Sequence, residues 1–221
     1  MAKKPRTPPP PRVKQQGPRR REVKRDASGF VSGRNVVLAA VALGSIALAI
    51  VLGIVLFGGR GNGGAGSAAL AKKLAAVGCV LKTYPSLGQS HVQSLDATVR
   101  YNSFPPTSGP HYQQPALWNR YTDPLSLVQQ VHNLEHGGVI IQYGDKVPSS
   151  TVDLLRSFYD SGPNGMLLAP LPKLGDKIAL SAWTHLATCA GYNKTALTAF
   201  RDAYRGKGPE RIPVSALKPG S

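Results

Sequence analysis

The sequence predicts an α+β fold, in which a small β-sheet is layered with helices and follows a disordered basic tail and one transmembrane helix. Three features lead to this prediction. Residues 1–35 are basic and rich in proline, and residues 36–57 carry no charge. The rest of the chain contains helix-like and strand-like segments in the order α-β-α-β-β-α, which is typical of a layered α+β domain.

The N-terminal residues 1–35 form the most basic stretch of the chain. They hold eleven of its 27 lysines and arginines but only two acids, and so supply +9 of the formal charge of +16. Such a composition buries too little apolar surface to offset the chain entropy, and we expect a disordered cytoplasmic tail. Anionic lipids of the inner leaflet are its expected partner. No RNA-binding or helix-turn-helix pattern follows, so no nucleic-acid partner is expected.

Residues 36–57 predict a single-pass anchor in the cell membrane. This run of uncharged, mostly aliphatic residues would span about 33 Å as a helix, enough for the hydrocarbon core of a bilayer. Basic residues precede the run, which places the N-terminus in the cytoplasm and the C-terminal domain outside it. Cleavage after Phe57, as in a signal peptide, is the alternative. Ser45, Ala49 and Gly53 form a line of small residues that favours helix pairing and hence a homodimer.

The exported part divides into a linker, a domain and a tail. We expect residues 58–78 to form a glycine-rich linker and a short helix, residues 79–213 an extracytoplasmic α+β domain, and residues 214–221 a flexible C-terminus. The two cysteines of the chain, Cys79 and Cys189, fall in this part, where oxidation is permitted. We favour a disulfide between them, worth roughly 4–5 kcal/mol on the chain-entropy model, over two buried thiols.

Turn residues and apolar patterns predict the elements of the domain. The segment 102–111 contains three prolines and a glycine, which rule out a regular element and leave a stiff loop that ends at His111. Residues 207–210 are expected to be loose. Glycines end three of the expected helices, and Asn193 caps the last one. The expected helices cover residues 67–77, 124–136, 151–160 and 194–205, and the expected strands 98–101, 139–143, 166–169 and 178–183.

A cluster of metal-ligand residue types lies at the end of the second expected helix. His132, Glu135 and His136 form an H-x-x-E-H motif, and the two histidines fall on one helical face, away from the apolar stripe. Histidines four residues apart can share a cation, and His111 can supply a third ligand. A site of this kind suits copper or zinc, with Glu135 as a further ligand or as a residue that orients a histidine.

Two other functions fit the same residues. H-x-x-E-H is also the inverted zinc-protease motif, in which both histidines bind zinc, the glutamate is the base, and Glu210 would be the third ligand. Alternatively, the histidines and Glu135 form a hydrogen-bond network in a domain that contacts an envelope protein partner. We assign no catalytic residue and favour a non-enzymatic protein.

Several motifs in order resemble a known family. They are Tyr-Asn-Ser-Phe-Pro-Pro-Thr-Ser-Gly-Pro-His at 101–111, Val-His-Asn-Leu-Glu-His-Gly-Gly at 131–138, Ala-Pro-Leu-Pro at 169–172, Ala-Trp at 182–183, and Gly-Lys-Gly-Pro-Glu at 206–210. Together they resemble the bacterial family catalogued as domain of unknown function 3105, over about Cys79 to Pro213. The resemblance implies single-pass anchored proteins with an extracytoplasmic domain and no assigned activity. It places His111, His132, Glu135 and His136 inside its motifs, and His91 and His185 outside them.

Overall fold

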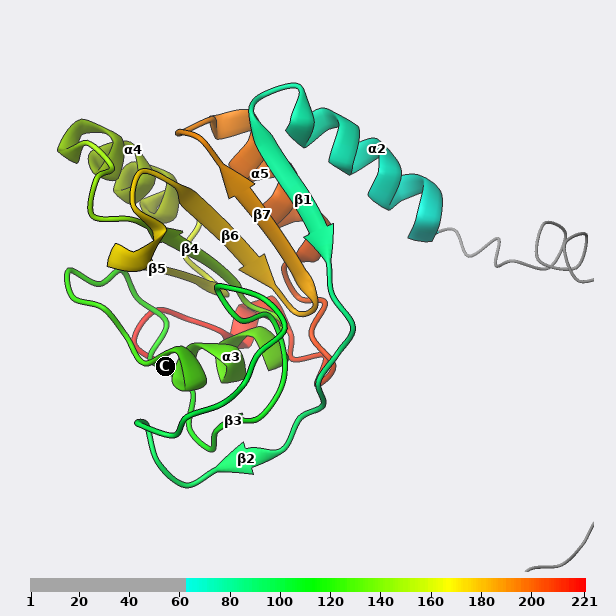
Figure 1. Ribbon diagram of the computed structural model, residues 1–221, viewed down its shortest axis with the longest axis vertical. Coiled ribbons are helices and arrows are strands. Elements are labelled where there is room, and N and C mark those ends of the chain that lie inside the picture. The colour runs from blue at the N-terminus through cyan, green and yellow to red at the C-terminus, as the bar shows by residue number, and fades with distance from the viewer. Residues whose placement is uncertain (1–62) are drawn as a thin grey trace, which may run out of the picture. The chain divides into compact units, whose positions relative to one another are not determined.

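The computed structural model describes residues 63–221, which form a mixed sheet with helices on both faces (Figure 1). The basic tail at 1–35, the transmembrane helix expected at 36–57 and the start of the linker lie outside the described residues. Within 63–221, no helix is both long and apolar enough to cross a membrane. The helices are α2 (Gly63–Ala75), α3 (Leu127–Glu135), α4 (Ser149–Asp160) and α5 (Lys194–Tyr204), with 3-10 turns η1 (Pro172–Leu174) and η2 (Val214–Ala216).

The main sheet has five strands in the order β1-β7-β6-β4-β5. They are β1 (Cys79–Thr83), β4 (Val139–Tyr143), β5 (Met166–Pro170), β6 (Ile178–Ala182) and β7 (His185–Cys189). Only β4 and β5 pair in parallel, because α4 carries the chain across between them. A separate two-stranded parallel sheet joins β2 (His91–Val92) to β3 (His111–Tyr112).

The two faces of the main sheet are covered differently. Side chains alternate along β4, so Val139 and Ile141 enter one core and Ile140 the other. The larger core packs against α2, α4 and α5, which contribute Leu74, Leu155 and Phe200 among others. The smaller core includes Leu134 of α3. Figure 1 shows α3, β2 and β3 gathered at the bottom of the view, away from α4 and α5.

The expected α+β class is confirmed, and most element positions agree with the sequence. Strand β4 covers the expected residues, and Asn193 caps α5 by accepting a hydrogen bond from the Ala196 amide at 3.0 Å. Helix α3 begins at Leu127, three residues after the expected Pro124. The segment 98–101, expected to be a strand, has no regular secondary structure, whereas β1 and β7 form an antiparallel pair that the sequence did not predict.

Cys79 and Cys189 face each other across that pair and form the expected disulfide. Both residues are buried in the larger core. The disulfide therefore ties the edge strand β1, the first strand of the domain, to the interior of the sheet.

The C-terminal residues 214–221, expected to be flexible, pack on the domain. Leu217 is buried, and its carbonyl accepts a hydrogen bond from the Gly165 amide at 2.7 Å. The Trp118 amide donates to the Ser221 carbonyl at 3.1 Å, and the Gly220 amide donates to the Trp118 carbonyl at 2.9 Å. Composition suggested a loose tail, but these backbone pairings and one apolar anchor hold it in place.

Candidate metal centre

Four side chains from three separate segments converge on one point in the described part of the chain. They are His91 of β2, His111 of β3, and His132 and Glu135 of α3. One ligand atom from each lies within 4.8 Å of all the others. His111, His132 and Glu135 are buried, whereas His91 is exposed and forms the solvent side of the group.

Backbone pairing places two of these histidines side by side, and one of them, His111, ends the proline loop (residues 102–111). His91 and His111 are direct partners in the short parallel sheet, and the His111 amide donates to the Ser90 carbonyl at 2.9 Å. The Tyr101 hydroxyl donates to the Pro110 carbonyl at 2.7 Å, next to His111. A stiff loop with these ties holds the His111 ring at a low entropy cost.

Helix α3 is buried on more than its apolar side, because it lies between the main sheet and the proline loop. Leu134 packs on the smaller core, while the Asn133 side chain receives the Ala116 amide at 2.9 Å and donates to the Ala116 carbonyl at 2.8 Å. Gln130 accepts from Gln142 of β4 at 2.9 Å. These buried polar pairs fix the rotation of the helix, and thereby the direction of His132 and Glu135.

Backbone carbonyls set the tautomers of the two buried histidines. His111 Nδ1 lies 2.8 Å from the Gly109 carbonyl, and His132 Nδ1 lies 2.7 Å from the Tyr112 carbonyl. A carbonyl only accepts, so each Nδ1 carries the proton and each neutral ring presents a bare Nε2. Both Nε2 atoms face Glu135 Oε2, at 3.0 and 3.8 Å, respectively. Fixing the far nitrogen in this way is how proteins commonly orient metal-binding histidines.

Glu135 is held by a neutral donor. The Gln89 side chain donates to Glu135 Oε1 at 2.8 Å, which leaves Oε2 directed at the histidines. Residues 63–221 contain fifteen Lys and Arg against nine acids, yet among the described residues none of these cations pairs with Glu135. Its negative charge is therefore available to a bound cation.

The electrostatics keep His132 and His136 unprotonated near neutral pH. Burial lowers the pKa of His132, and the charges of His136 and His111 lower it further, although the Tyr112 carbonyl and Glu135 oppose the shift. Burial also lowers the pKa of His136, against the effect of Glu210 and Glu135. A neutral imidazole is the form that binds a metal ion.

His136 lies beside the group of four rather than in it. Its ring stands 4.6 Å from that of His132, centroid to centroid, and its Nε2 lies 3.0 Å from Glu210 Oε2. His185 lies outside this group and packs on Tyr204. The sequence thus named three of the four converging residues and missed His91. Only the pairing of β2 with β3 brings His91 close to His111, and two-residue strands leave no periodic signal in a sequence.

The donor set fits a borderline transition metal. Three imidazoles and one carboxylate suit Zn²⁺ or Cu²⁺, whereas Ca²⁺ and Mg²⁺ prefer oxygen ligands. Ligands about 2.1 Å from a tetrahedral ion lie roughly 3.4 Å apart, so the outer atoms of the group must approach one another on binding. His91 is exposed and has the freedom to do so.

A family model described as protein of unknown function (DUF3105) matches residues 91–215, more than half of the chain. The protein therefore belongs to this family, as the motifs predicted. All four converging residues lie within the matched region, as do His136 and Glu210. No curated protein and no solved structure matches the chain.

Proposed function

We propose that this protein is a membrane-anchored extracytoplasmic domain that binds one copper or zinc ion through His91, His111, His132 and Glu135. The proposal rests on one observation: Nε2 atoms of two buried histidines, each with its Nδ1 proton held by a carbonyl, face the same carboxylate oxygen. His91 lies at the open side of this arrangement.

A metal ion satisfies this arrangement better than a proton does. Bare Nε2 atoms and a carboxylate oxygen are all acceptors, so something electropositive must lie between them. A proton can join His111 to Glu135 across 3.0 Å, but the 3.8 Å between His132 Nε2 and Glu135 Oε2 exceeds hydrogen-bond length. A cation between these atoms contacts both rings and the carboxylate at once.

The residues set limits on the choice of metal. Imidazole nitrogen with carboxylate oxygen binds Cu²⁺ and Zn²⁺ well, and Cu²⁺ more tightly in general. No cysteine thiolate is available, because both cysteines form the disulfide. Soft-metal binding through sulfur is therefore not a property of this group of ligands.

Elemental analysis of the full-length chain, purified in detergent, tests the proposal. We expect about one ion of copper or zinc per chain, held at four ligand positions. Glu135→Gln keeps the size of the side chain and removes its charge, and His132→Ala removes one ring. Each should weaken metal binding by at least about a hundredfold. His185→Ala, which removes a histidine outside the group, should leave the metal content unchanged.

A purely structural role is the competing explanation, because the same contacts already tie the proline loop to α3. His111 reaches Glu135 from the end of that loop, and Gln89 reaches it from the segment just before β2. Under this explanation, the purified chain holds no ion, and added Zn²⁺ or Cu²⁺ leaves the melting temperature where it was. A bound ion should instead raise it in proportion to the logarithm of its concentration over Kd.

The zinc hydrolase is less well supported by the geometry. A general base has to be free to take a proton from water, but Glu135 lies between His111 and Gln89. His136 and Glu210, the further ligands that the motif would require, do not belong to the converging group in residues 63–221. If the unaltered chain cleaved peptides, and the Glu135→Gln chain kept its metal but lost that activity, the result would support the zinc hydrolase over the metal-binding domain.

The membrane anchor is proposed from residues 36–57 alone. Protease added to intact cells should remove the domain while residues 1–35 stay protected, if the N-terminus is cytoplasmic. Anionic lipids remain the proposed partners of the basic tail. A homodimer and an envelope protein partner are further proposals, which crosslinking in native membranes would test.

A further inference from the structure

We propose that His136 and Glu210 form a second, outer metal position through which the ion of the inner site is taken up and released. This inference rests on the proposed function, since an exchange position requires an inner ion. It assigns a role to two residues of the described chain that the group of four leaves out.

The outer pair has the spacing of two ligands on one ion. His136 Nε2 and Glu210 Oε2 lie 3.0 Å apart. Two donors about 2.1 Å from a common ion are this far apart when they subtend roughly a right angle, which is within the range of metal coordination. The two side chains are 17% and 41% exposed, respectively, so water can complete the coordination.

The chain is built to bring Glu210 to this place. The Gly206 amide donates to the Gly137 carbonyl at 2.7 Å. Gly208 packs so closely on the end of α3 that a Cβ there would collide with the Glu135 carbonyl oxygen. Only glycine allows this approach. The segment 207–210, expected to be loose, is thus fixed against the helix that carries both sites.

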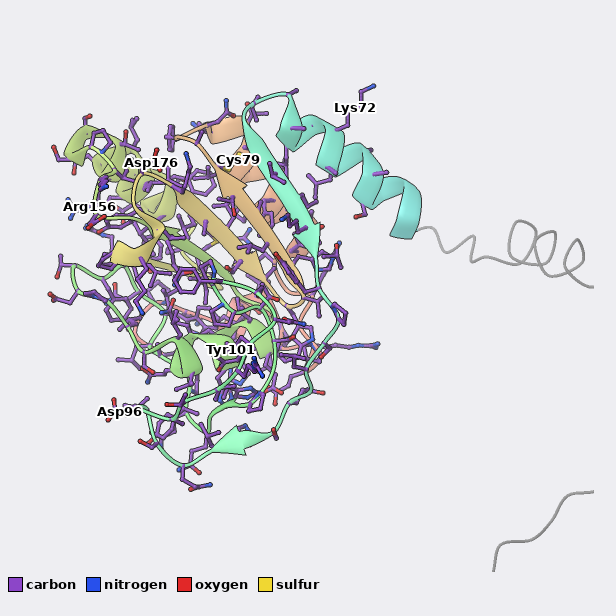
Figure 2. The ribbon with its side chains drawn as sticks, viewed as in Figure 1. Lys72, Cys79, Asp96, Tyr101, Arg156 and Asp176 are labelled. Atoms are coloured by element: carbon purple, nitrogen blue, oxygen red, sulfur yellow. A yellow bond between two sulfur atoms is a disulfide. The ribbon has the colours of Figure 1, made fainter. Side chains whose placement is uncertain are left out.

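The partner choice of the glutamates also points to metal chemistry. Residues 63–221 contain only two glutamates, Glu135 and Glu210, and both face histidines. The ion-paired aspartates pair with arginine or lysine and lie at the surface, where Figure 2 also shows Lys72, Arg156 and Asp176. Both glutamates therefore face an imidazole, which is a common metal ligand, and not a lysine or arginine.

The outer pair lies next to the inner site through His132. The rings of His132 and His136 stand 4.6 Å apart, and His132 is also 4.8 Å from His111 and 5.3 Å from His91. His132 therefore lies between the outer pair and the rest of the inner group. Two protein ligands hold an ion more weakly than four, so an ion at the outer position exchanges readily with solvent.

Metal exchange kinetics test the inference on the full-length chain in detergent. Uptake of Zn²⁺ by the metal-free chain is followed by stopped flow, and release by transfer of Zn²⁺ to a coloured chelator. We expect Glu210→Gln and His136→Gln each to slow uptake and release by about tenfold, because an intermediate position is lost. The Kd, as the ratio of the two rates, should stay within about threefold of the unaltered chain.

Asp176→Asn is the matched control, since it removes an exposed, ion-paired carboxylate that belongs to neither site and should leave both rates unchanged. Unaltered uptake and release rates in the Glu210 and His136 variants would overturn the inference. The ion would then enter and leave the inner site past the exposed His91. A large loss of equilibrium affinity in these variants would also overturn it, because the pair would then belong to the inner site. If the unaltered chain binds no Zn²⁺ tightly, the proposed function fails, and the inference fails with it.

Discussion

The two faces of the main sheet use opposite kinds of burial. The face covered by α2, α4 and α5 is filled by nineteen buried residues that are apolar or belong to the disulfide. The other face carries a core of only five such residues, with α3 and the proline loop beyond it. Of nine buried polar side chains, seven lie between Thr107 and Glu135.

The difference indicates a division of labour between the two faces, in which one stabilises the fold and the other orients the candidate ligands. Apolar burial contributes most of the free energy of folding, so the first face should account for stability. Buried polar groups cost free energy unless they are paired, and all seven of these side chains on the second face are hydrogen-bonded, five of them to backbone carbonyls or amides. Burying polar groups on this face holds the buried candidate ligands in fixed orientations.

The largest expected effect is on the apolar face. Leu155 of α4 is fully buried in the larger core, so Leu155→Ala should lower the free energy of unfolding by about 2–5 kcal/mol through lost burial and a cavity. Denaturant unfolding of the metal-free chain measures this loss. If the division of labour is correct, the Kd for Zn²⁺ changes less than about threefold in the same variant. A parallel loss of metal affinity would show that the two faces are not independent.

Reducing the disulfide should have the next largest effect. Cys79 and Cys189 close a loop with a sequence separation of 110, and removing such a constraint typically costs about 2–4 kcal/mol. The pair lies in the larger core, so the bound ion should remain after reduction as long as the chain stays folded. Thermal melting with and without reductant, with metal content determined at each point, checks both statements. Loss of the ion before unfolding would contradict the proposal that the larger core and the metal site are independent of each other.

The sequence predicted the apolar face better than the polar one, for physical reasons. The run Val139–Tyr143 is rich in β-branched residues, and α5 has an Asn193 cap and an apolar stripe, so local patterns were sufficient. Strand β7 was missed because it contains His185 and Thr188 among short apolar residues, and only its neighbours β1 and β6 make it a strand. The disulfide was predicted, but not that it joins paired strands.

The candidate site shows the same limit. Helical spacing suggested that His132 and His136, four residues apart, act together on one helical face, away from the apolar stripe. In the structure α3 is covered on both sides, and His132 instead turns with Glu135, three residues away, toward His111. His91 joins the group only because the chain folds back so that β3, twenty residues later, pairs with β2, and no local sequence rule predicts that pairing.

A smaller effect is expected from pH on the polar face. The pKa of His132 and that of His136 are both lowered, mainly by burial, so the unfolded chain takes up protons at a higher pH than the folded chain. The free energy of unfolding of the metal-free protein should therefore fall as the pH drops below about 6.5. Glu135 near both rings and Glu210 near His136 partly offset the effect of burial, as does the Tyr112 carbonyl at His132, whereas His111 lowers both pKa values further.

Comparison with a variant isolates this contribution. In a His132→Gln, His136→Gln chain without metal, the decline between pH 7 and pH 5 should be shallower than in the unaltered chain, measured by denaturant unfolding at each pH. His185→Gln should keep the steeper decline. An equally steep decline in the double variant would assign the acid sensitivity to other groups.

The smallest expected effect concerns the tie that fixes the proline loop. The Tyr101 hydroxyl donates to the Pro110 carbonyl at 2.7 Å, and burial raises the pKa of this hydroxyl to about 12. Tyr101→Phe removes one hydrogen bond and should cost about 0.5–1.5 kcal/mol near neutral pH, with little change in metal affinity. Tyr112→Phe is the control, because the described residues offer no hydrogen bond to its hydroxyl.

The same variant has a distinct signature at high pH. Since the folded pKa of Tyr101 lies above the ordinary value of about 10, the unfolded chain loses this proton first as the pH rises. The free energy of unfolding of the unaltered chain therefore falls as the pH rises, whereas the Tyr101→Phe variant lacks the hydroxyl that causes this fall. The difference in free energy of unfolding between the two chains should narrow from pH 9 to pH 11. A constant difference over that range would mean that burial does not raise the pKa of the Tyr101 hydroxyl in the folded chain.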